Sequence, residues 1–526
     1  MSYPRTAQVL IIEDDQRPKA LYDKIFEAVL PKKGLSIDPP QYAFCLEDGL
    51  RQLASDRMFH LVILDLQLPE VAGQPAPESI EFGQALLKAC IEREDYPIPC
   101  LLVISGHLNK AKQSELEESV RQGFAYGRVL VKSDDLADEI ATAVREAHRY
   151  CDVGVHLRDA DARAFPTLSP REEYLLRLAA LREQTSGLDL EWWSAQSDQG
   201  GVWTKTLMGR FILNNARGFS LHSFFKFGES KWAETTFGDA QAMGQKLKHV
   251  KVQGRLIAGS RSLLITQAAT SGDGAPLSLS DVLAMPTDQV AAQLTAIAVD
   301  VAEQVKRLGD TSPDERPVAE LIWSHHDRAI IKAQWQSRAD GDTRAGANPI
   351  DLYDRLKASR YLVRHSRQTM LHGDLNFTNI AVEFVSEKPL AFIFDGEGCA
   401  AGVNVADLAT LEVTLLLQQD ADGREPEIVA HCKSLYCLSA EPGGTDLSRA
   451  ENTRLLVQAI RDEALKVATL ETYALMVFDK ALMQLGGLGI QSTGNKIRSH
   501  ADAARVAGFA AAWLLEVAPH LADAAK

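Results

Sequence analysis

Cysteine is scarce in this sequence, and its spacing excludes the usual cysteine-based frameworks. Seven cysteines occur among 526 residues, and none forms a CxxC pair. The nearest two, Cys432 and Cys437, have no histidine cluster beside them that would complete a zinc site. We therefore expect reduced thiols, as in a cytoplasmic protein.

The chain also lacks an excess of positive charge and any long apolar run. It carries 56 lysines and arginines against 71 aspartates and glutamates, a formal net charge of -15. Nucleic-acid binding needs a basic surface that neutralises phosphates, and anionic membranes likewise attract basic segments. No apolar run approaches the ~18 residues of a membrane-spanning helix. We expect no nucleic-acid partner and no membrane insertion.

Residues 8–150 alternate short apolar runs with amphipathic segments. This alternation is typical of an α/β domain, with a parallel sheet and crossover helices. The candidate strands are residues 8–13, 41–46, 61–66, 100–105 and 127–132. They predict one doubly wound, five-stranded parallel sheet whose ligand site lies at the carboxyl ends of the strands.

Polar residues end four of these candidate strands. Glu13 and Asp14 end the first, and Asp65 ends the third. Ser105 ends the fourth and Lys132 the fifth. The carboxyl ends of parallel strands converge at one edge, so we expect these side chains to meet there. The carboxylates would bind Mg²⁺, which allows Asp65 to act as a nucleophile toward phosphorus. Ser105 and Lys132 would contact the phosphoryl oxygens.

The segments VLIIEDD, LVILDLQLP, VISG and VLVK, together with Gly83, resemble the response-regulator receiver family. The resemblance covers roughly residues 6–150 and implies a flavodoxin-like receiver domain at 1–155. It assigns roles to the same positions: Glu13 and Asp14 the acidic pair, Asp65 the phospho-acceptor, Ser105 the switch hydroxyl and Lys132 the conserved-type lysine.

Two positions and one loop depart from the family pattern. Ser133 follows Lys132, where the family usually has proline, and Val129 stands where the family has an aromatic switch residue. Residues 70–82 also lengthen the loop that follows Asp65.

Residues 156–195 have the pattern of a helical connector. Ser169 is placed to cap a helix, Pro170 suits its first position, and apolar spacing follows through residue 183. This helix resembles the first helix of a helix-turn-helix. However, no second helix pair and no basic recognition face follow, which argues against DNA binding. We expect the helix at 169–183 to carry signals between the flanking domains.

The remaining chain, 196–526, contains a second acidic motif. Residues 371–379 read LHGDLNFTN, and a predicted hairpin at 380–395 ends in Asp395. The hairpin would return Asp395 to the side of Asn379. With Asp374, these oxygen ligands would surround a Mg²⁺-nucleotide, which suits phosphoryl transfer.

This motif resembles the aminoglycoside phosphotransferase and choline kinase group, and the whole domain looks similar to predicted kinases called ternary-complex-associated domains. The resemblance implies a bilobal kinase-like α+β domain, with an N-lobe at about 196–275 and a largely helical C-lobe at about 276–526. It assigns these roles: Asp374 the base or orienter of the acceptor hydroxyl, Asn379 and Asp395 the Mg²⁺ ligands, His372 a residue that shapes the loop, and Asp407 the residue that holds it.

The nucleotide-binding residues follow from the same resemblance. Lys226 in FFKFG would reach the α- and β-phosphates of ATP. Its acidic partner would be Glu234 or Asp239, and the sequence does not decide between them. Gly200 and Gly201 mark the phosphate-covering loop, although the segment has no GxGxxG pattern.

The sequence thus predicts a two-component response regulator. Phosphorylation at Asp65, by a sensor histidine kinase or phosphotransfer protein, would regulate a kinase-like domain that transfers phosphate from ATP. The alternative is a pseudokinase scaffold that binds nucleotide or a partner protein without catalysis.

The acceptor cannot be identified from the sequence. It is a small molecule or a protein. Adenylation of the acceptor, instead of phosphorylation, also stays open. Glu397 or Glu412 could bind a cationic acceptor. A homodimer formed through the receiver's fourth and fifth helices also stays open.

Overall fold

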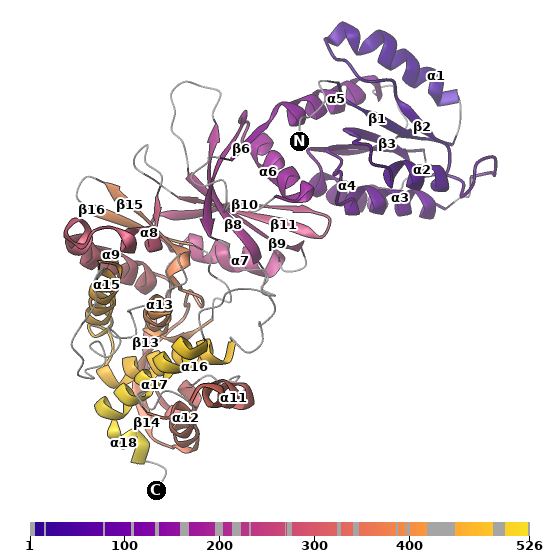
Figure 1. Ribbon diagram of the computed structural model, residues 1–526. Helices are drawn as coiled ribbons and strands as arrows, with labels where there is room; N and C mark the ends of the chain where they lie inside the picture. The colour runs from indigo at the N-terminus through magenta and orange to yellow at the C-terminus, as the bar shows by residue number, and fades with distance from the viewer. Residues whose placement is uncertain are drawn as a thin grey trace. The chain divides into compact units, whose positions relative to one another are not determined.

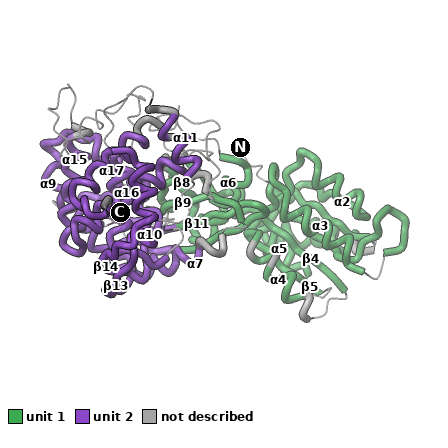
Figure 2. The backbone as a smooth tube through the Cα atoms, turned by 90° about the horizontal axis from the view of Figure 1, so that it is seen from below, with its two compact units in different colours: residues 1–195, 202–234, 253–265 green, residues 196–201, 235–252, 266–526 purple. Residues whose placement is uncertain are grey.

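The computed structural model describes most of the chain, in two compact units. The described residues are 6–14, 17–76, 79–106, 110–131, 136–157, 168–194, 203–212, 222–230, 233–268, 270, 276–322, 328–339, 347–385, 388–394, 396, 400–417, 448–487 and 500–523. Unit 1 comprises residues 1–195, 202–234 and 253–265, and unit 2 comprises 196–201, 235–252 and 266–526 (Figure 2).

The first sheet of unit 1 contains five parallel strands in the order β2-β1-β3-β4-β5. The strands are β1 (Val9–Ile12), β2 (Gln41–Ala43), β3 (Leu61–Asp65), β4 (Cys100–Ser105) and β5 (Tyr126–Val131). All five candidate strands are therefore confirmed, with no end displaced by more than three residues. Their buried apolar runs made them recognisable, because parallel strands are covered on both faces.

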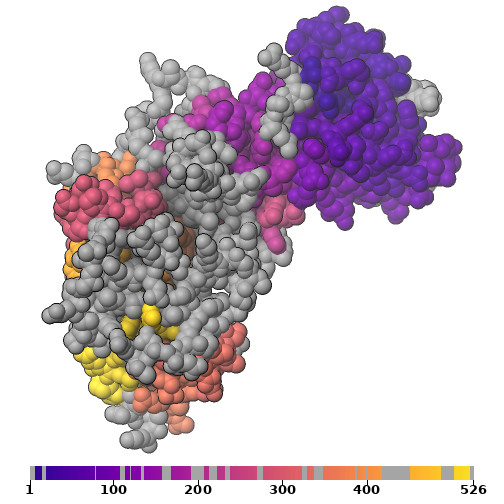
Figure 3. All heavy atoms as spheres, in the orientation of Figure 1, coloured from indigo at the N-terminus to yellow at the C-terminus, as the bar shows by residue number. Residues whose placement is uncertain are grey.

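Helices cover both faces of this sheet (Figure 1). They are α1 (Arg17–Lys24), which continues into η1 (Ile25–Val29) and η2 (Pro31–Lys33), then α2 (Leu46–Leu53), α3 (Glu81–Glu92), α4 (Lys110–Gly123) and α5 (Leu136–Asp152). Alternate residues of each strand enter opposite cores, one shared with α1, η1 and α5 and the other with α2, α3 and α4. The first sheet and its helices form a continuous indigo to violet surface (Figure 3).

The second sheet contains six strands in the order β10-β11-β9-β8-β7-β6. The strands are β6 (Gly154–Leu157), β7 (Gly187–Ser194), β8 (Trp203–Ile212), β9 (His222–Glu229), β10 (Val250–Ala258) and β11 (Arg261–Ala268). Helix α6 (Pro170–Arg182) packs against β6 and β7, and helix α7 (Ala233–Gly244) lies between β9 and β10 in the sequence.

This sheet corrects the expected helical connector at 156–195. Only α6 matches that expectation, whereas β6 and β7 pair with each other and β7 pairs with β8. The segment therefore belongs to the second sheet rather than lying between two domains. The domain limits at residues 155 and 196 stay predictions.

The predicted N-terminus of the connector helix is confirmed at α6. Ser169 Oγ accepts a hydrogen bond from Glu172 N at 3.2 Å, and Ser169 N donates to Glu172 Oε2 at 2.8 Å. This capping box provides hydrogen-bond partners for backbone N–H groups at the N-terminus of α6, and Pro170 at the first position has no N–H group that needs a partner. Nine of the 13 residues of α6 are buried, so the helix lies inside a core rather than on a surface.

Most elements of unit 2 are helices. In chain order they are β12 (Leu277–Ser278), α8 (Leu279–Ala284), α9 (Thr287–Arg307), β13 (Thr311–Pro317), α10 (Val318–Leu321), α11 (Arg328–Ala339), α12 (Pro349–Ala358), β14 (Leu362–Gln368), η4 (Phe377–Asn379), β15 (Ile380–Val385), β16 (Lys388–Ile393), β17 (Gly402–Val403), α13 (Ala406–Leu416), α15 (Ser448–Ala464), α16 (Leu470–Gly487), α17 (His500–Val517) and α18 (Pro519–Asp523). Two three-stranded sheets, β12-β15-β16 and β13-β14-β17, lie among them.

The predicted hairpin is confirmed as β15 and β16. Its register runs from Ile380 opposite Ile393 to Val385 opposite Lys388. The antiparallel pairing brings Phe394 back beside Asn379, as the motif required.

A buried ion pair joins the helices of unit 2. Arg461 of α15 donates to both carboxylate oxygens of Glu412 in α13, at 3.0 and 2.6 Å, and Tyr473 of α16 donates to Glu412 Oε2 at 2.8 Å. Glu412 is fully buried. Its carboxylate is occupied by these structural partners, which corrects the suggestion that it receives a cationic substrate.

Within the part of the chain that the structure describes, no helix has both the length and the apolar character that crossing a membrane requires.

Gly83 fixes the approach of α3 to the end of β3. A Cβ at this position would lie 2.4 Å from both Leu66 Cα and Leu66 O. We predict that Gly83→Ala lowers the stability of unit 1 by about 1–3 kcal/mol, because either the helix or the strand end must move. The midpoint of urea unfolding measures the loss.

Gly123→Ala at the end of α4 is the matched control. Among the described residues, no heavy atom lies within 4 Å of a Cβ there. An unchanged or slightly higher midpoint is expected for this variant. Equal midpoints for both variants would contradict the close approach of α3.

Candidate functional site

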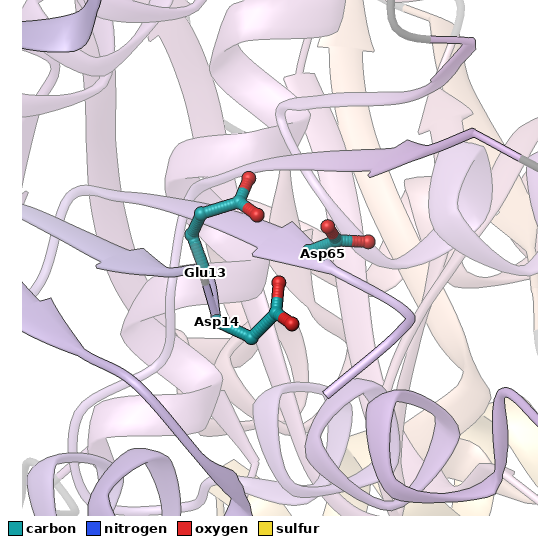
Figure 4. A group of neighbouring side chains, drawn as sticks. All are labelled: Glu13, Asp14 and Asp65. Carbon is teal, nitrogen blue, oxygen red and sulfur yellow. The ribbon is translucent and has the colours of Figure 1, made fainter. Parts of the chain in front are cut away.

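Three carboxylates gather at the carboxyl edge of the first sheet. Glu13 and Asp14 directly follow β1, and Asp65 ends the adjacent β3. Their ligand oxygens all lie within 4.8 Å of one another, and the side chains point toward a common centre (Figure 4). The predicted acidic cluster is therefore present.

The surroundings of the cluster are largely buried. Glu13 and Asp65 are buried, and Gln67 N donates to Asp65 Oδ1 at 3.1 Å. Burial raises the pKa of the nearby Tyr22, and the negative charges of Glu13 and Asp65 raise it further.

The donor set fits a small divalent cation. Three carboxylates this close repel one another when ionised, and a cation with oxygen ligands removes that repulsion. Glu13, Asp14 and Asp65 would hold Mg²⁺, which would supply neutralisation of an incoming phosphate.

Ser105 lies at the same edge. It is buried at the end of β4, and Ile104 beside it is in register with Asp65 of β3. Ser105 itself is in register with Val131, the last residue of β5. The predicted Lys132 comes next in the sequence and lies outside the described residues, so its role stays a prediction.

The second motif forms a compact loop held by Asp407. Its Oδ2 accepts a hydrogen bond from His372 N at 2.7 Å, and its Oδ1 accepts one from Gly373 N at 3.0 Å. Asp407 is buried in the first turn of α13. Gly373 adopts a φ of 84°, a left-handed conformation that favours glycine. These features explain the His-Gly-Asp order, because the two backbone amides before Asp374 must turn toward one carboxylate.

The same loop holds Asp374 and Asn379 close together. Asn379 Nδ2 donates to Asp374 O at 2.9 Å, which leaves the carboxamide oxygen of Asn379 as the atom able to ligate a cation. Asn376 Nδ2 donates to Asp374 Oδ2 at 3.2 Å and so orients the carboxylate. Sequence reasoning missed Asn376, although an asparagine two residues after the aspartate is a signal for a local side-chain contact.

Two hydrogen bonds connect the end of the β15–β16 hairpin to this loop. Phe394 N donates to Asn379 O at 3.1 Å, and His372 Nε2 lies 3.1 Å from Phe394 O. His372 is fully buried, and its role in shaping the loop stays a prediction. The predicted ligand Asp395 follows Phe394 but lies outside the described residues.

Helix α7 packs against the residue after Asp395. A Cβ at Gly396 would lie 1.8 Å from Met243 Cε, so a larger residue at this position would require the methionine side chain to move. The sequence analysis missed this contact between α7 and the motif. A glycine directly after the second motif aspartate was the available signal.

A pocket of about 550 Å³ opens beside the loop. Gly373, Ala401 and Val403 line it together with residues of β13, β14 and α16. Its charged lining contains both signs, with Asp314 and Asp479 as acids and Arg316 and Lys480 as bases. Arg316 Nε lies 2.8 Å from Asp314 Oδ2, and this hydrogen bond holds the pKa of Asp314 below its ordinary value. The space is large enough for a small-molecule acceptor.

Of the expected nucleotide residues, Lys226 is the best described. It is buried in β9, in register with Thr206 of β8. Glu234 lies in the first turn of α7, and Asp239 lies in the middle of that helix. Gly200 and Gly201 lie outside the described residues. The choice between Glu234 and Asp239 therefore stays open.

Comparison with known proteins finds similarity in structure alone. No protein-family model matches the chain, and no curated protein does. A solved structure of the aminoglycoside phosphotransferase APH(4)-Ia, a thermostable mutant in its apo form, is 12% identical over 65% of this chain and 99% of its own, with a TM-score of 0.34.

Two further solved structures are kinases. A microcompartment-associated aminopropanol kinase is 13% identical over 66% of this chain and 98% of its own, with a TM-score of 0.29. A Plasmodium vivax ethanolamine kinase is 12% identical over 77% of this chain and 94% of its own, with a TM-score of 0.29. The chain is thus similar to phosphotransferases and kinases, at a level too low to carry an argument about its activity.

Proposed function

We propose that the chain is a kinase-like phosphotransferase that uses ATP and Mg²⁺. The observation that carries the proposal is the loop in which Asp407 holds His372 and Gly373 while Asn379 holds Asp374. Such preorganisation of a carboxylate beside a metal-ligating amide is what phosphoryl transfer needs, since positioning does most of the catalysis.

Asp374 is the proposed base for the acceptor hydroxyl. The hydroxyl oxygen bonds to the γ-phosphorus of ATP while the bond from that phosphorus to the β,γ-bridging oxygen breaks. ADP departs with the electron pair, and the hydroxyl proton passes to the Asp374 carboxylate. Asn376 keeps that carboxylate oriented. Asn379 and Asp395 are the proposed ligands of Mg²⁺, which supplies charge neutralisation of the phosphates.

Lys226 is proposed to contact the nucleotide phosphates, together with the loop at Gly200 and Gly201. Its burial in β9 is compatible with this role, because a buried lysine needs a partner for its charge and phosphate oxygens can supply one. The acceptor is an unidentified small molecule or protein, and the pocket beside Gly373 is its proposed place.

The first sheet is proposed to be a receiver domain with Asp65 as its phospho-acceptor. The strand order, the carboxylate cluster and the buried Ser105 at the same edge support this proposal. Asp65 would receive its phosphoryl group from a sensor histidine kinase or phosphotransfer protein. Phosphorylation adds roughly two negative charges, which can change the coupling to the rest of the chain.

Acetyl phosphate tests the receiver. An oxygen of Asp65 attacks its phosphorus, the bond from phosphorus to the acetyl oxygen breaks, and acetate leaves. We predict one Mg²⁺-dependent phosphoryl group in the wild type and none in Asp65→Asn, measured by intact mass. Asp56→Asn, an exposed aspartate outside the cluster, is the control and should label like the wild type. Labelling that persists in Asp65→Asn would refute the assignment.

ATP consumption tests the kinase-like site. We predict that Asp374→Ala lowers Mg²⁺-dependent ADP formation by about 100-fold or more, because the variant lacks the proposed base. Asp462→Ala on the exposed face of α15 is the control and should keep wild-type turnover. Nucleotide binding without turnover in the wild type, measured with a panel of hydroxyl acceptors, would favour the scaffold instead.

A further inference from the structure

One face of α6 binds the ends of three helices that cover the first sheet. Arg171, Tyr174 and Arg177 are spaced three residues apart and are all buried. Arg171 donates to Ile91 O at 3.1 Å and to Arg93 O, at the C-terminus of α3. Carbonyls at a helix C-terminus have no partner within the helix, so the guanidinium satisfies them and complements the helix dipole.

Tyr174 and Arg177 form similar hydrogen bonds with carbonyl groups at the C-termini of α4 and α5. Tyr174 Oη lies 2.8 Å from Gly123 O at the end of α4, and 3.0 Å from Ile98 O just before β4. Arg177 donates to Val153 O, immediately after α5. These ends lie at the edge of the sheet opposite the carboxylate cluster, because each crossover helix runs antiparallel to its strands.

The end of α3 also reaches the second sheet. Ser260, in the turn between β10 and β11, donates from its Oγ to Glu94 at 2.6 Å, and Arg171 Nε lies 3.6 Å from Glu94. We call Glu94, Arg171 and Ser260 the α3 junction. Gly259 in the same turn approaches closely, since a Cβ there would lie 2.9 Å from Ile91 O.

The β10–β11 turn that contains Ser260 also forms hydrogen bonds with the end of β9. Ser260 O accepts a hydrogen bond from Ser230 N at 2.8 Å, and Ser262 Oγ lies 3.3 Å from Gly228 O. β9 carries Lys226 four residues before Ser230. The α3 junction therefore fixes the end of the strand that holds the proposed nucleotide lysine.

The opposite end of α3 lies against the proposed phospho-acceptor. Gly83 in its first turn touches Leu66, the residue directly after Asp65. The 12 residues of α3 span about 18 Å. One rigid helix thus connects the backbone at Asp65 with the α3 junction.

We propose that α3 transmits the phosphorylation state of Asp65 to β9 through the α3 junction, so that Glu94, Arg171 and Ser260 are positioning residues for Lys226. The proposal rests on the proposed receiver and names its route of regulation. A shift of Leu66 moves α3 along its axis, and the junction passes this movement to the β10–β11 turn and the end of β9. Such a route needs evidence of coupling in addition to the contacts.

Hydrogen exchange in the full chain tests the route. Mass spectrometry follows the backbone amides of residues 222–230 with Mg²⁺, before and after treatment with acetyl phosphate. We expect the exchange rate there to change by about fivefold or more in the wild type, the lower end of ordinary allosteric coupling. Ser260→Ala and Glu94→Ala are surface variants that leave the cores intact, remove the hydrogen bond between these two side chains and should remove this response.

Three further variants isolate the junction. Glu92→Gln, on the exposed end of the same helix, should respond like the wild type. Ser260→Thr retains a hydroxyl and should also respond. The double variant Ser260→Ala with Glu94→Ala should lose no more than either single variant, as expected for one interaction.

The outcomes separate the route from the receiver itself. If Asp65 carries phosphate by mass but exchange at 222–230 is unchanged, or still changes in both Ser260→Ala and Glu94→Ala, the route through α3 is wrong and the receiver stands. If Asp65 takes no phosphate from acetyl phosphate, the receiver and the route are both wrong.

Discussion

Unit 1 depends on hydrogen bonds between one buried face of α6 and the backbone carbonyl groups at the C-termini of α3, α4 and α5. Arg171, Tyr174 and Arg177 contact the terminal carbonyls of three helices that would otherwise be buried without partners. Each buried polar group without a hydrogen-bond partner costs about 1–3 kcal/mol. Loss of the three α6 side chains would leave several carbonyl groups without a partner at once. The same helix contributes apolar residues to a core shared with β7, β8, β9, β10 and β11. Contacts of α6 therefore join the first and second sheets of unit 1.

In unit 2, a single carboxylate likewise binds two backbone groups and fixes the conformation of the second motif. Asp407 binds two successive backbone amides, and this fixes the chain direction on both sides of Asp374. The β15–β16 hairpin then closes on the loop through Phe394. The buried pair of Glu412 and Arg461 holds α13, the helix that begins with Asp407, against α15. Preorganisation of the loop thus extends from a backbone contact to the helical core.

Local patterns explain what the sequence could predict. The five parallel strands are continuous apolar runs, the start of α6 is a capping box, and the HGD motif and hairpin are short-range features. The acidic cluster followed from these, because parallel strands place their carboxyl ends together.

Long-range pairing explains what the sequence could not predict. β6 and β7 pair across the whole of α6, the Arg171 and Ser260 contacts join residues far apart in the chain, and Met243 meets Gly396 from a distant helix. Glu412 resembles a solvent-facing acid in the sequence, and only its partners reveal it as structural. The roles of Lys132, Gly200, Gly201 and Asp395 stay predictions, as these residues lie outside the described part of the chain.

The central claim is that phosphorylation of the first sheet controls phosphoryl transfer by the rest of the chain. The most direct test compares ATP turnover by the full chain before and after Asp65 is phosphorylated by acetyl phosphate, in the wild type and in Asp65→Asn. The account predicts a change of about fivefold or more in the wild type, within the usual range of allosteric coupling, and none in the variant. Equal turnover by phosphorylated and unphosphorylated wild-type protein, with the phosphoryl group on Asp65 verified by mass, would contradict it.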